Sequence, residues 1–453
     1  MGLTEQTSVV IVGGGFSGIA AAKALHQNKI PFILLEARDR LGGRTYTKPL
    51  AGDRYVDLGG QWIGPTQDRM YELAREHGIN WYDTYNEGKN LLDLNEKLRS
   101  YTGLIPKMDV VSLINIDFVL KKLERLARKI SVESPWSHPS AQHWDSLTLE
   151  AFVRKHCWTK SCYKVVRAGL ETVYACELNE VSLLHALFYI RSGTNLNNLL
   201  SIEQGAQQHR LEGGMQPLAE KMAEPFKEST RLNAPVRAIS HTPQGVIVEA
   251  DGWSISSHRV ILAVPPVLIS DIRFTPELPL RKTQLIQKMS MGIVGKVLAI
   301  YPKPFWRTNG FSGQVVADEH APFQTLFDAS PSHGEYGALM AFCIADRARD
   351  FFSREELERR KVTLDCYTRY FGEEASTPEH YVDHCWANEA WSQGCYAALY
   401  PTGAWTNFRD TLAAPVGPIH FAGTETSKVW YGYIEGAVRA GERAALEVKE
   451  ALA

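Results

Sequence analysis

Residues 8–44 read SVVIVGGGFSGIAAAKALHQNKIPFILLEARDRLGGR, and this stretch decides the fold. A short apolar run, Val9 to Val12, leads directly into a glycine-rich turn, and a helical pattern of small residues follows. A second apolar run, Phe32 to Leu35, ends on Glu36. This order of strand, glycine turn, helix, strand and acid is typical of the β-α-β unit that binds a dinucleotide. The sequence therefore predicts an α/β fold of the two-dinucleotide-binding, Rossmann-like type.

Each glycine of the turn has a physical reason to be there. Gly13 permits the tight turn, Gly15 lets the backbone approach a pyrophosphate, and Gly18 lets the helix pack close to the strand. The first N–H groups of that helix point at the phosphates. Glu36 follows the second strand, where its carboxylate can accept hydrogen bonds from ribose hydroxyls. We expect these four residues to bind the dinucleotide.

The residues after Glu36 favour FAD over NAD. They include Arg38 and the sequence Leu41-Gly42-Gly43-Arg44, an RxGGR extension found in many flavoproteins. Gly43 is expected to pass close to the ribityl-pyrophosphate, with Arg38 and Arg44 as fixed cationic donors. A basic surface turn would not explain two adjacent glycines between arginines.

A second glycine pair follows downstream, in Asp57-Leu58-Gly59-Gly60-Gln61-Trp62. We expect Gly60, Gln61 and Trp62 to lie against the flavin.

Composition limits the class of protein. The 453 residues are enough for two domains. Lysine plus arginine (49) nearly balance aspartate plus glutamate (51), so nothing indicates nucleic acid or an anionic membrane as a partner. Apolar runs are too short for a transmembrane segment, and no signal peptide is evident. The seven cysteines are scattered and odd in number, which does not resemble a disulfide framework. We expect a soluble, cytoplasmic protein.

The dinucleotide signal is split along the chain. Residues 109–130 predict an amphipathic helix, and more helical sequence runs from Leu147 to about Asn195. Strand patterns return at Arg231 to Ser240 and beyond. We therefore expect a second, α+β substrate domain inserted twice. The predicted FAD-binding domain comprises 1–80, 210–285 and 386–453, and the substrate domain comprises 81–209 and 286–385.

Shorter motifs continue to the C-terminus. They are Leu41–Arg44, Pro135-Trp136, Cys157–Lys160, Glu180–Ser182, Gly213-Gly214, Phe274–Pro279, Gly295-Lys296, Gly394–Tyr396, Phe421–Thr426 and Gly432–Ala437. With the glycine turn, they occur in the same order as in the flavin-containing monoamine oxidases, which the chain resembles over nearly its whole length. Each motif alone is weak, but the combination is specific.

The resemblance implies catalytic roles for three residues. Tyr396 and Tyr433 resemble the two tyrosines that form an aromatic cage beside the flavin and hold the neutral amine between their ring faces. Lys296 resembles the lysine that holds a water near flavin N5 and assists the reaction of reduced flavin with oxygen. From the residues alone, core aromatics and a lysine at a strand edge remain alternatives.

The resemblance also extends the cofactor site. Cys395 matches the cysteine that forms a thioether to the flavin in the mammalian monoamine oxidases, although Gln393 replaces a glycine of the usual motif. Many bacterial relatives lack this bond, so non-covalent FAD stays an alternative to a bond through Cys395. The other matching positions are Trp386, Val236, Gly423, Glu425, Tyr433 and Ile434, the last of which begins a helix that can stabilise negative charge on the flavin.

The resemblance predicts oxidative deamination of primary amines, with a small-molecule amine and O₂ as reaction partners and a homodimer as a further expectation. The expected pocket residues are Thr172, Val173, Leu200, Gln207, Val315 and Thr325. In the family the position of Thr325 is often bulky, so its small side chain favours long or bulky apolar amines. Polyamine, cyclic-amine and L-amino-acid oxidases share the scaffold and stay open, as does a flavin-binding regulatory protein without turnover.

Other chemistries lack their motifs. The chain has no HExxH, no CxxC pair, no P-loop and no Gly-x-Ser-x-Gly. His156, Cys157 and Cys162 are close in sequence, but they occur in helical sequence without a second ligand pair. We interpret them as structural and predict no metal site.

Overall fold

The structure, a computed structural model, describes residues 3–103, 106–242 and 245–453. A five-stranded sheet collects strands that are far apart in the sequence, and all of its pairings are parallel. Every residue of the two apolar runs that flank the glycine turn is buried, as expected for a parallel sheet covered on both faces. The order is β11 (Thr230–Arg231), β3 (Phe32–Leu35), β2 (Val9–Val12), β15 (Arg259–Leu262) and β24 (Ile419–Phe421).

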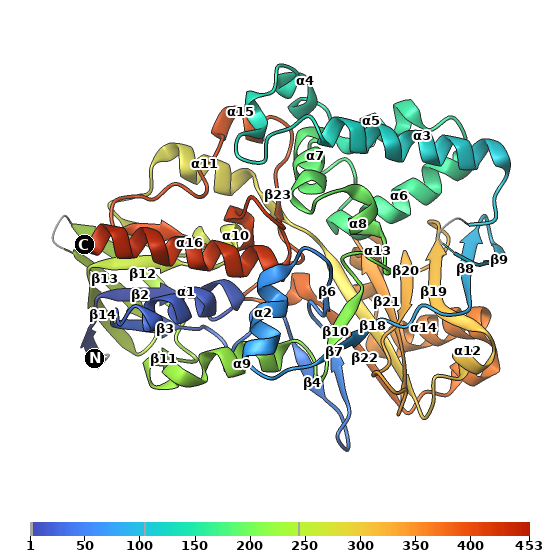
Figure 1. Cartoon of the computed structure of the whole chain (residues 1–453), viewed down its shortest axis with the longest axis horizontal. Helices are drawn as coiled ribbons and strands as arrows, with labels where there is room; N and C mark the ends of the chain where they lie inside the picture. Colours follow the sequence, from blue (N-terminus) through green and yellow to red (C-terminus); the bar gives the residue numbers. More distant parts are fainter. Residues whose placement is uncertain (1–2, 104–105, 243–244) are drawn as a thin grey trace.

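Two helices pack tightly beside this sheet. They are α1 (Phe16–Gln27) and α16 (Ile434–Leu452), which lie side by side in Figure 1. The contact needs glycine, because a Cβ at Gly441 would lie 2.0 Å from the carbonyl oxygen of Ser17. The α/β fold predicted from the glycine turn is therefore confirmed, and its first and last segments meet in one core.

A second five-stranded sheet lies next to the first. Its order is β1 (Leu3–Gln6), β14 (Trp253–Ser257), β13 (Gly245–Ala250), β12 (Val236–Thr242) and β16 (Arg273–Thr275). The strand pattern expected from Arg231 to Ser240 is not continuous, because β11 (Thr230–Arg231) and β12 (Val236–Thr242) belong to different sheets. Asn233 has a φ of +54°, and Pro235 has no N–H to donate to a ladder, so the strand is interrupted between the two sheets.

A seven-stranded sheet forms the other half of the molecule, drawn mainly in yellow and orange in Figure 1. Alternate residues of β18 enter two separate apolar cores, as the period-two geometry of a strand requires. One of these cores includes side chains of α14 (Glu356–Phe371). The order is β22 (His380–Cys385), β18 (Val294–Tyr301), β21 (Gly337–Ile344), β20 (Thr325–Asp328), β19 (Phe311–Ala317), β8 (Lys89–Leu94) and β9 (Lys97–Tyr101).

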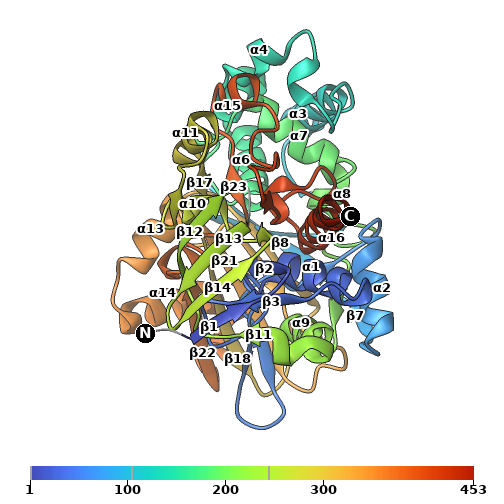
Figure 2. The same cartoon turned by 90° about the vertical axis from the view of Figure 1, so that its left-hand side faces the viewer.

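A group of helices covers the top of the molecule in Figures 1 and 2. The helix expected over 109–130 is confirmed as α3, with Asp109 as its N-cap. The members are α3 (Val110–Ala127), α4 (Ala141–Asp145), α5 (Leu149–His156), α6 (Lys160–Tyr174), α7 (Leu183–Ser192) and α8 (Leu196–Leu200). No helix within the described residues is both long and apolar enough to cross a membrane.

Small sheets connect segments from both predicted domains. In one of them β10 (His209–Leu211) pairs with β6 (Trp62–Ile63) and with β7 (Trp81–Asp83). In another β17 (Ser290–Met291) pairs with β23 (Ala398–Leu399). The division into 1–80, 210–285 and 386–453 against 81–209 and 286–385 stays a prediction.

Candidate active site

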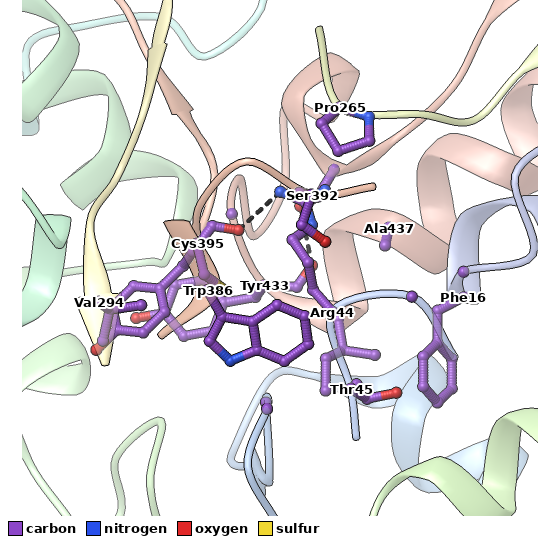
Figure 3. Close-up of a pocket in the computed structure, with 18 of the residues that line it drawn as sticks. Phe16, Arg44, Thr45, Pro265, Val294, Trp386, Ser392, Cys395, Tyr433 and Ala437 are labelled. Atoms are coloured by element: carbon purple, nitrogen blue, oxygen red, sulfur yellow. Dashed lines mark hydrogen bonds between the residues drawn. The ribbon is translucent and has the colours of Figure 1, made fainter. Parts of the chain in front are cut away.

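A cavity begins at the carboxyl ends of the parallel strands and continues between the helical group and the seven-stranded sheet. Loops that follow β2, β3, β15 and β24 form its first part, which is where open α/β sheets bind their ligands. Side chains of α6, β18, β19, β20 and β21 form its far part. Figure 3 shows Cys395, Trp386, Arg44 and Tyr433 at its wall.

Glu36 lies at the start of this cavity, and each of its carboxylate oxygens accepts a hydrogen bond from the backbone. Oε2 accepts a hydrogen bond from the backbone N–H of Gly14 at 2.6 Å, and Oε1 accepts one from Arg38 N–H at 2.8 Å. These bonds fix the carboxylate, which is 4% exposed. Each oxygen keeps a lone pair that can accept a further hydrogen bond from a ligand.

The glycine turn has the geometry that the sequence predicts. Gly13 has a φ of +106°, which disfavours any residue with a side chain. A Cβ at Gly18 would lie 1.8 Å from the carbonyl oxygen of Gly13, so Gly18 serves the packing of α1 against β2. Gly13, Gly15 and Gly43 line the cavity, whereas Gly18 lies behind it.

Two arginines of the extension are held by carboxylates. Arg44 contacts Glu425 at 2.6 Å and donates to the carbonyl oxygen of Tyr396 at 2.8 Å. Burial alone would lower the pKa of Arg44, but Glu425 outweighs it and the pKa is raised. Arg38 contacts Glu389 at 3.2 Å. Glu425 does not line the cavity; it positions Arg44, which does.

Four residues in register across the seven-stranded sheet line the far part of the cavity. Lys296 on β18 pairs with Phe342 on β21. Phe342 pairs with Thr325 on β20, and Thr325 pairs with Val316 on β19. Directly paired residues of neighbouring strands place their side chains on the same face. This row of four residues is therefore one wall of the cavity.

Lys296 is not at a strand edge, because β18 lies between β22 and β21. Its Nζ donates hydrogen bonds to the carbonyl oxygens of Asp57 (3.1 Å) and Gly59 (2.6 Å) and to Gln61 Oε1 (2.7 Å). Burial lowers the pKa of Lys296 to about 7, against the opposing effect of Asp57. Nearby Arg210 acts in the same direction as burial. Lys296 thus changes charge within the usual assay range.

Tyr396 and Tyr433 reach the cavity from different segments. Tyr396 precedes β23, and Tyr433 is the N-cap of α16. Burial raises the pKa of both phenols, so both stay neutral. Tyr396 packs edge-on against Phe342, with ring centroids 6.2 Å apart. The ring of Tyr433 packs against that of Tyr189, with centroids 6.0 Å apart. The structure brings both predicted cage residues to the same cavity.

Cys395 and Trp386 also line this cavity, and Trp386 donates from Nε1 to the carbonyl oxygen of Leu58 at 2.9 Å. Burial raises the pKa of the Cys395 thiol to about 12. Most of the other predicted positions line the cavity as well. These are Gly60, Gln61, Trp62, Val236, Gly423, Ile434, Thr172, Val173, Leu200 and Gln207.

Val315 is a wrong prediction. Its side chain is fully buried in the core on the other face of the sheet, with Leu91 and Trp306. Its neighbours Gln314 and Val316 line the cavity instead.

Several residues line the cavity that were not predicted from the sequence, among them Tyr189, Leu199, Gln314, Val316, Phe327 and Phe342. Phe342 could have been found from Lys296 had the pairing of β18 with β21 been known.

A family model described as flavin containing amine oxidoreductase matches residues 16–449. The chain belongs to this family. The "Putative flavin-containing monoamine oxidase AofH" of Mycobacterium tuberculosis (strain ATCC 25618 / H37Rv) is 40% identical over 440 residues, 97% of this chain and 96% of that protein. The resemblance expected from the sequence is confirmed, and the protein is a flavin-containing amine oxidase.

Two solved structures of amine oxidases are similar over the whole fold. Wild-type putrescine oxidase bound to putrescine has a TM-score of 0.93 and 32% identity, over 99% of this chain and 100% of that one. Cyclohexylamine oxidase from Brevibacterium oxydans IH-35A has a TM-score of 0.94 and 30% identity, over 98% of this chain and 99% of that one.

The residues of the cavity fit a flavin dinucleotide. Gln61 Nε2 is buried and, among the described residues, has no hydrogen-bond partner, so a ligand acceptor would satisfy it. Gly15 and Gly43 face each other closely, since a Cβ at Gly43 would lie 3.0 Å from Gly15 Cα. Both glycines line the cavity, so the backbone carries no side chain where a pyrophosphate would approach it.

Proposed function

We propose that the enzyme oxidises primary monoamines with long or bulky apolar tails, consuming oxygen and water and releasing an aldehyde or ketone, ammonia and hydrogen peroxide. The observation that carries this proposal is the lining of the far part of the cavity. Aromatic, aliphatic and neutral polar side chains form it, and the carboxylates among the described lining residues are Glu36 and Asp271. Glu36 follows β3 and Asp271 follows α10 (Pro266–Ile269), away from the row on the seven-stranded sheet.

FAD would occupy the first part of the cavity. Gly13, Gly15, Gly43 and Glu36 would hold its dinucleotide portion, and Val236 would contact the adenine. Trp386, Gly60 and Trp62 would lie against the isoalloxazine ring, with Cys395 as its covalent attachment. When bound, a flavin would supply the oxidant, since it can accept a hydride equivalent, one proton with two electrons, from the α-carbon of the amine and pass the two electrons to oxygen.

The protein's own residues position the amine. Tyr396 and Tyr433 would hold the free base between their ring faces, because the negative face of each ring attracts the positive edge of the amine dipole. Both phenols stay neutral, so the amine meets two uncharged rings and no phenolate ion. Lys296 would supply the positive charge that favours electron transfer to oxygen.

An apolar tail would gain free energy from burial beyond the cage. Val173, Leu200 and Val316 are aliphatic, and Thr325 leaves more volume than a bulky residue would. Each buried methylene contributes about 0.8 kcal/mol, which corresponds to about fourfold in kcat/KM. A second ammonium, as in putrescine, would find no carboxylate among the described residues of this part.

An α-carboxylate would also lack a partner there. The arginines among the described lining residues are Arg38, Arg44 and Arg237, of which Arg38 and Arg44 are held by Glu389 and Glu425. The bidentate arginine that a carboxylate substrate needs is therefore not available at the cage. This disfavours an L-amino-acid oxidase.

The test is a series of linear alkylamines of increasing length, with cyclohexylamine and putrescine, ranked by kcat/KM in a peroxide-coupled assay. We expect kcat/KM to rise with each methylene and putrescine to rank below the monoamine of equal length. Thr325→Tyr should penalise the longest amine most, while Thr325→Ser serves as the matched control. A preference for putrescine or for the shortest monoamines would contradict the proposal.

A further inference from the structure

Two cysteines outside the cavity lie next to each other at the junction of α5 and α6. Cys157 is the C-cap of α5, and Cys162 is in the first turn of α6. The Cys162 thiol donates a hydrogen bond to the Cys157 sulfur, with the two Sγ atoms 3.4 Å apart. Cys157 is partly exposed, whereas Cys162 is fully buried.

The junction between the helices is held firmly. Asn115 on α3 donates from Nδ2 to the carbonyl oxygen of His156 at 2.8 Å, and its Oδ1 accepts from Trp158 N–H at 2.5 Å. Thr159 caps α6 by accepting from the backbone N–H of Cys162 at 3.1 Å. The sulfur atoms are thus kept together by the backbone on both sides.

The two thiols differ in exposure and in their part in the hydrogen bond, and these differences give them different roles. The hydrogen bond from Cys162 lowers the pKa of Cys157, which favours the thiolate at the partly exposed position. Cys162 is the protonated donor behind it. A partly exposed cysteine of lowered pKa with a second thiol in contact is the arrangement of a redox-active pair.

We propose that Cys157 and Cys162 form a peroxide-reactive pair that closes to a disulfide. The Cys157 thiolate attacks one peroxide oxygen, so that an S–O bond forms, the O–O bond breaks and the second oxygen leaves as water after taking a proton. The Cys162 sulfur then attacks the sulfenic sulfur, the S–S bond forms, and the S–O bond breaks as a second water leaves with the Cys162 proton. The two sulfurs lose two electrons in total, which the peroxide gains.

The oxidant is the peroxide that the proposed function releases, so this inference rests on that function for its source of oxidant but not for its chemistry. The disulfide would connect the end of α5 to the start of α6. Gly169, Thr172 and Val173, near the other end of α6, line the substrate part of the cavity.

The sequence provides a direct assay. Trypsin cleaves after Lys155, Lys160 and Lys164, which places Cys157 and Cys162 on separate short peptides, His156–Lys160 and Ser161–Lys164. Holoenzyme is treated with hydrogen peroxide, alkylated under denaturing conditions, digested and analysed by mass spectrometry. We expect the two peptides to appear joined, lighter by two hydrogen atoms than their sum, and to separate after dithiothreitol.

Two cysteine variants and two control cysteines make the result decisive. Cys162→Ser should abolish the joined product and leave Cys157 as a sulfenic acid that dimedone traps, whereas Cys157→Ser should leave Cys162 unoxidised. Cys343 and Cys385 are internal controls, because both pair with Gly295 from opposite sides and β18 separates them. Recovery of both peptides as separate alkylated species after peroxide would overturn the inference.

A third sample replaces added peroxide by turnover of an alkylamine in air, with and without catalase. Joined peptides that catalase prevents would support both the inference and the proposed release of peroxide. Joined peptides with added peroxide, but none during turnover, would support the thiol chemistry and count against the proposed function alone.

Discussion

At the scale of single residues, the cage tyrosines are expected to act through their rings and not through their hydroxyls. Both phenols stay neutral, and their rings line the cavity. Tyr396→Ala or Tyr433→Ala should slow reduction of the flavin by about 10- to 100-fold, about 1.4 to 2.8 kcal/mol of barrier. The phenylalanine variants should keep most of the rate. Stopped-flow absorbance under anaerobic conditions measures it, and equal losses in the alanine and phenylalanine variants would contradict a ring-based cage.

Lys296 gives a pH-dependent prediction. Burial lowers its pKa to about 7, so the ammonium is mostly charged at pH ~6 and mostly neutral at pH ~8. If the charge assists electron transfer to oxygen, reoxidation should slow as the pH rises through about 7. Lys296→Met should slow reoxidation at low pH and remove this pH dependence, with little effect on flavin reduction. Reoxidation of Lys296→Met at the wild-type rate across the series would show that the lysine has another role.

At the scale of one strand, two neighbouring valines of β19 point to opposite faces of the sheet and have different roles. Val316 lines the cavity, and Val315 is buried in the core behind it. Val316→Phe should lower kcat/KM for the longest amine about tenfold relative to the shortest, about 1.4 kcal/mol. Val315→Ala should instead lower the free energy of unfolding on the order of 2 kcal/mol and leave the substrate ranking unchanged. Denaturant unfolding and the amine series together measure both, and exchanged phenotypes would refute the assignment.

The same strand shows why part of the site could not be predicted from the sequence. The glycine turn and Glu36 could be predicted because their geometry depends on residues close in sequence. The face of β19 depends on its partners: pairing with β8 shifts register between Phe311 and Val315, and Gly313 has a φ of +81°. Matching this segment to the family, without knowledge of the pairing, gave Val315 instead of Val316. Phe342 was missed for a related reason, since only strand pairing places it beside Lys296.

At the scale of the whole molecule, a bound flavin would touch segments from both ends of the chain. Gly15, Glu36, Cys395 and Gly423 all line its expected site. Wild-type protein precipitated with acid should keep its yellow colour in the pellet, and Cys395→Ala should release FAD to the supernatant. Cys343→Ala is the matched control, because Cys343 lies on the other face of the sheet. Complete release of FAD from wild-type protein would rule out the tether.

The Cys395→Ala variant also tests how much cofactor binding stabilises the folded protein. A ligand that binds only the folded state at a hundred times its Kd stabilises it by about 2.7 kcal/mol. Thermal unfolding of the flavin-free variant should therefore occur at a lower temperature than that of the same variant with excess FAD. An unfolding temperature independent of FAD would mean that the cavity does not bind this cofactor.

The proposed function requires that this cavity bring a primary amine and a flavin together for electron transfer. The most direct measurement is the flavin absorbance of the holoenzyme after anaerobic mixing with a linear alkylamine such as hexylamine. We expect the yellow colour to bleach in a single fast phase whose rate saturates with amine concentration and is lower in Tyr396→Ala, and we expect the colour to return when oxygen is admitted. A flavin that stays oxidised with every amine of the series would contradict it.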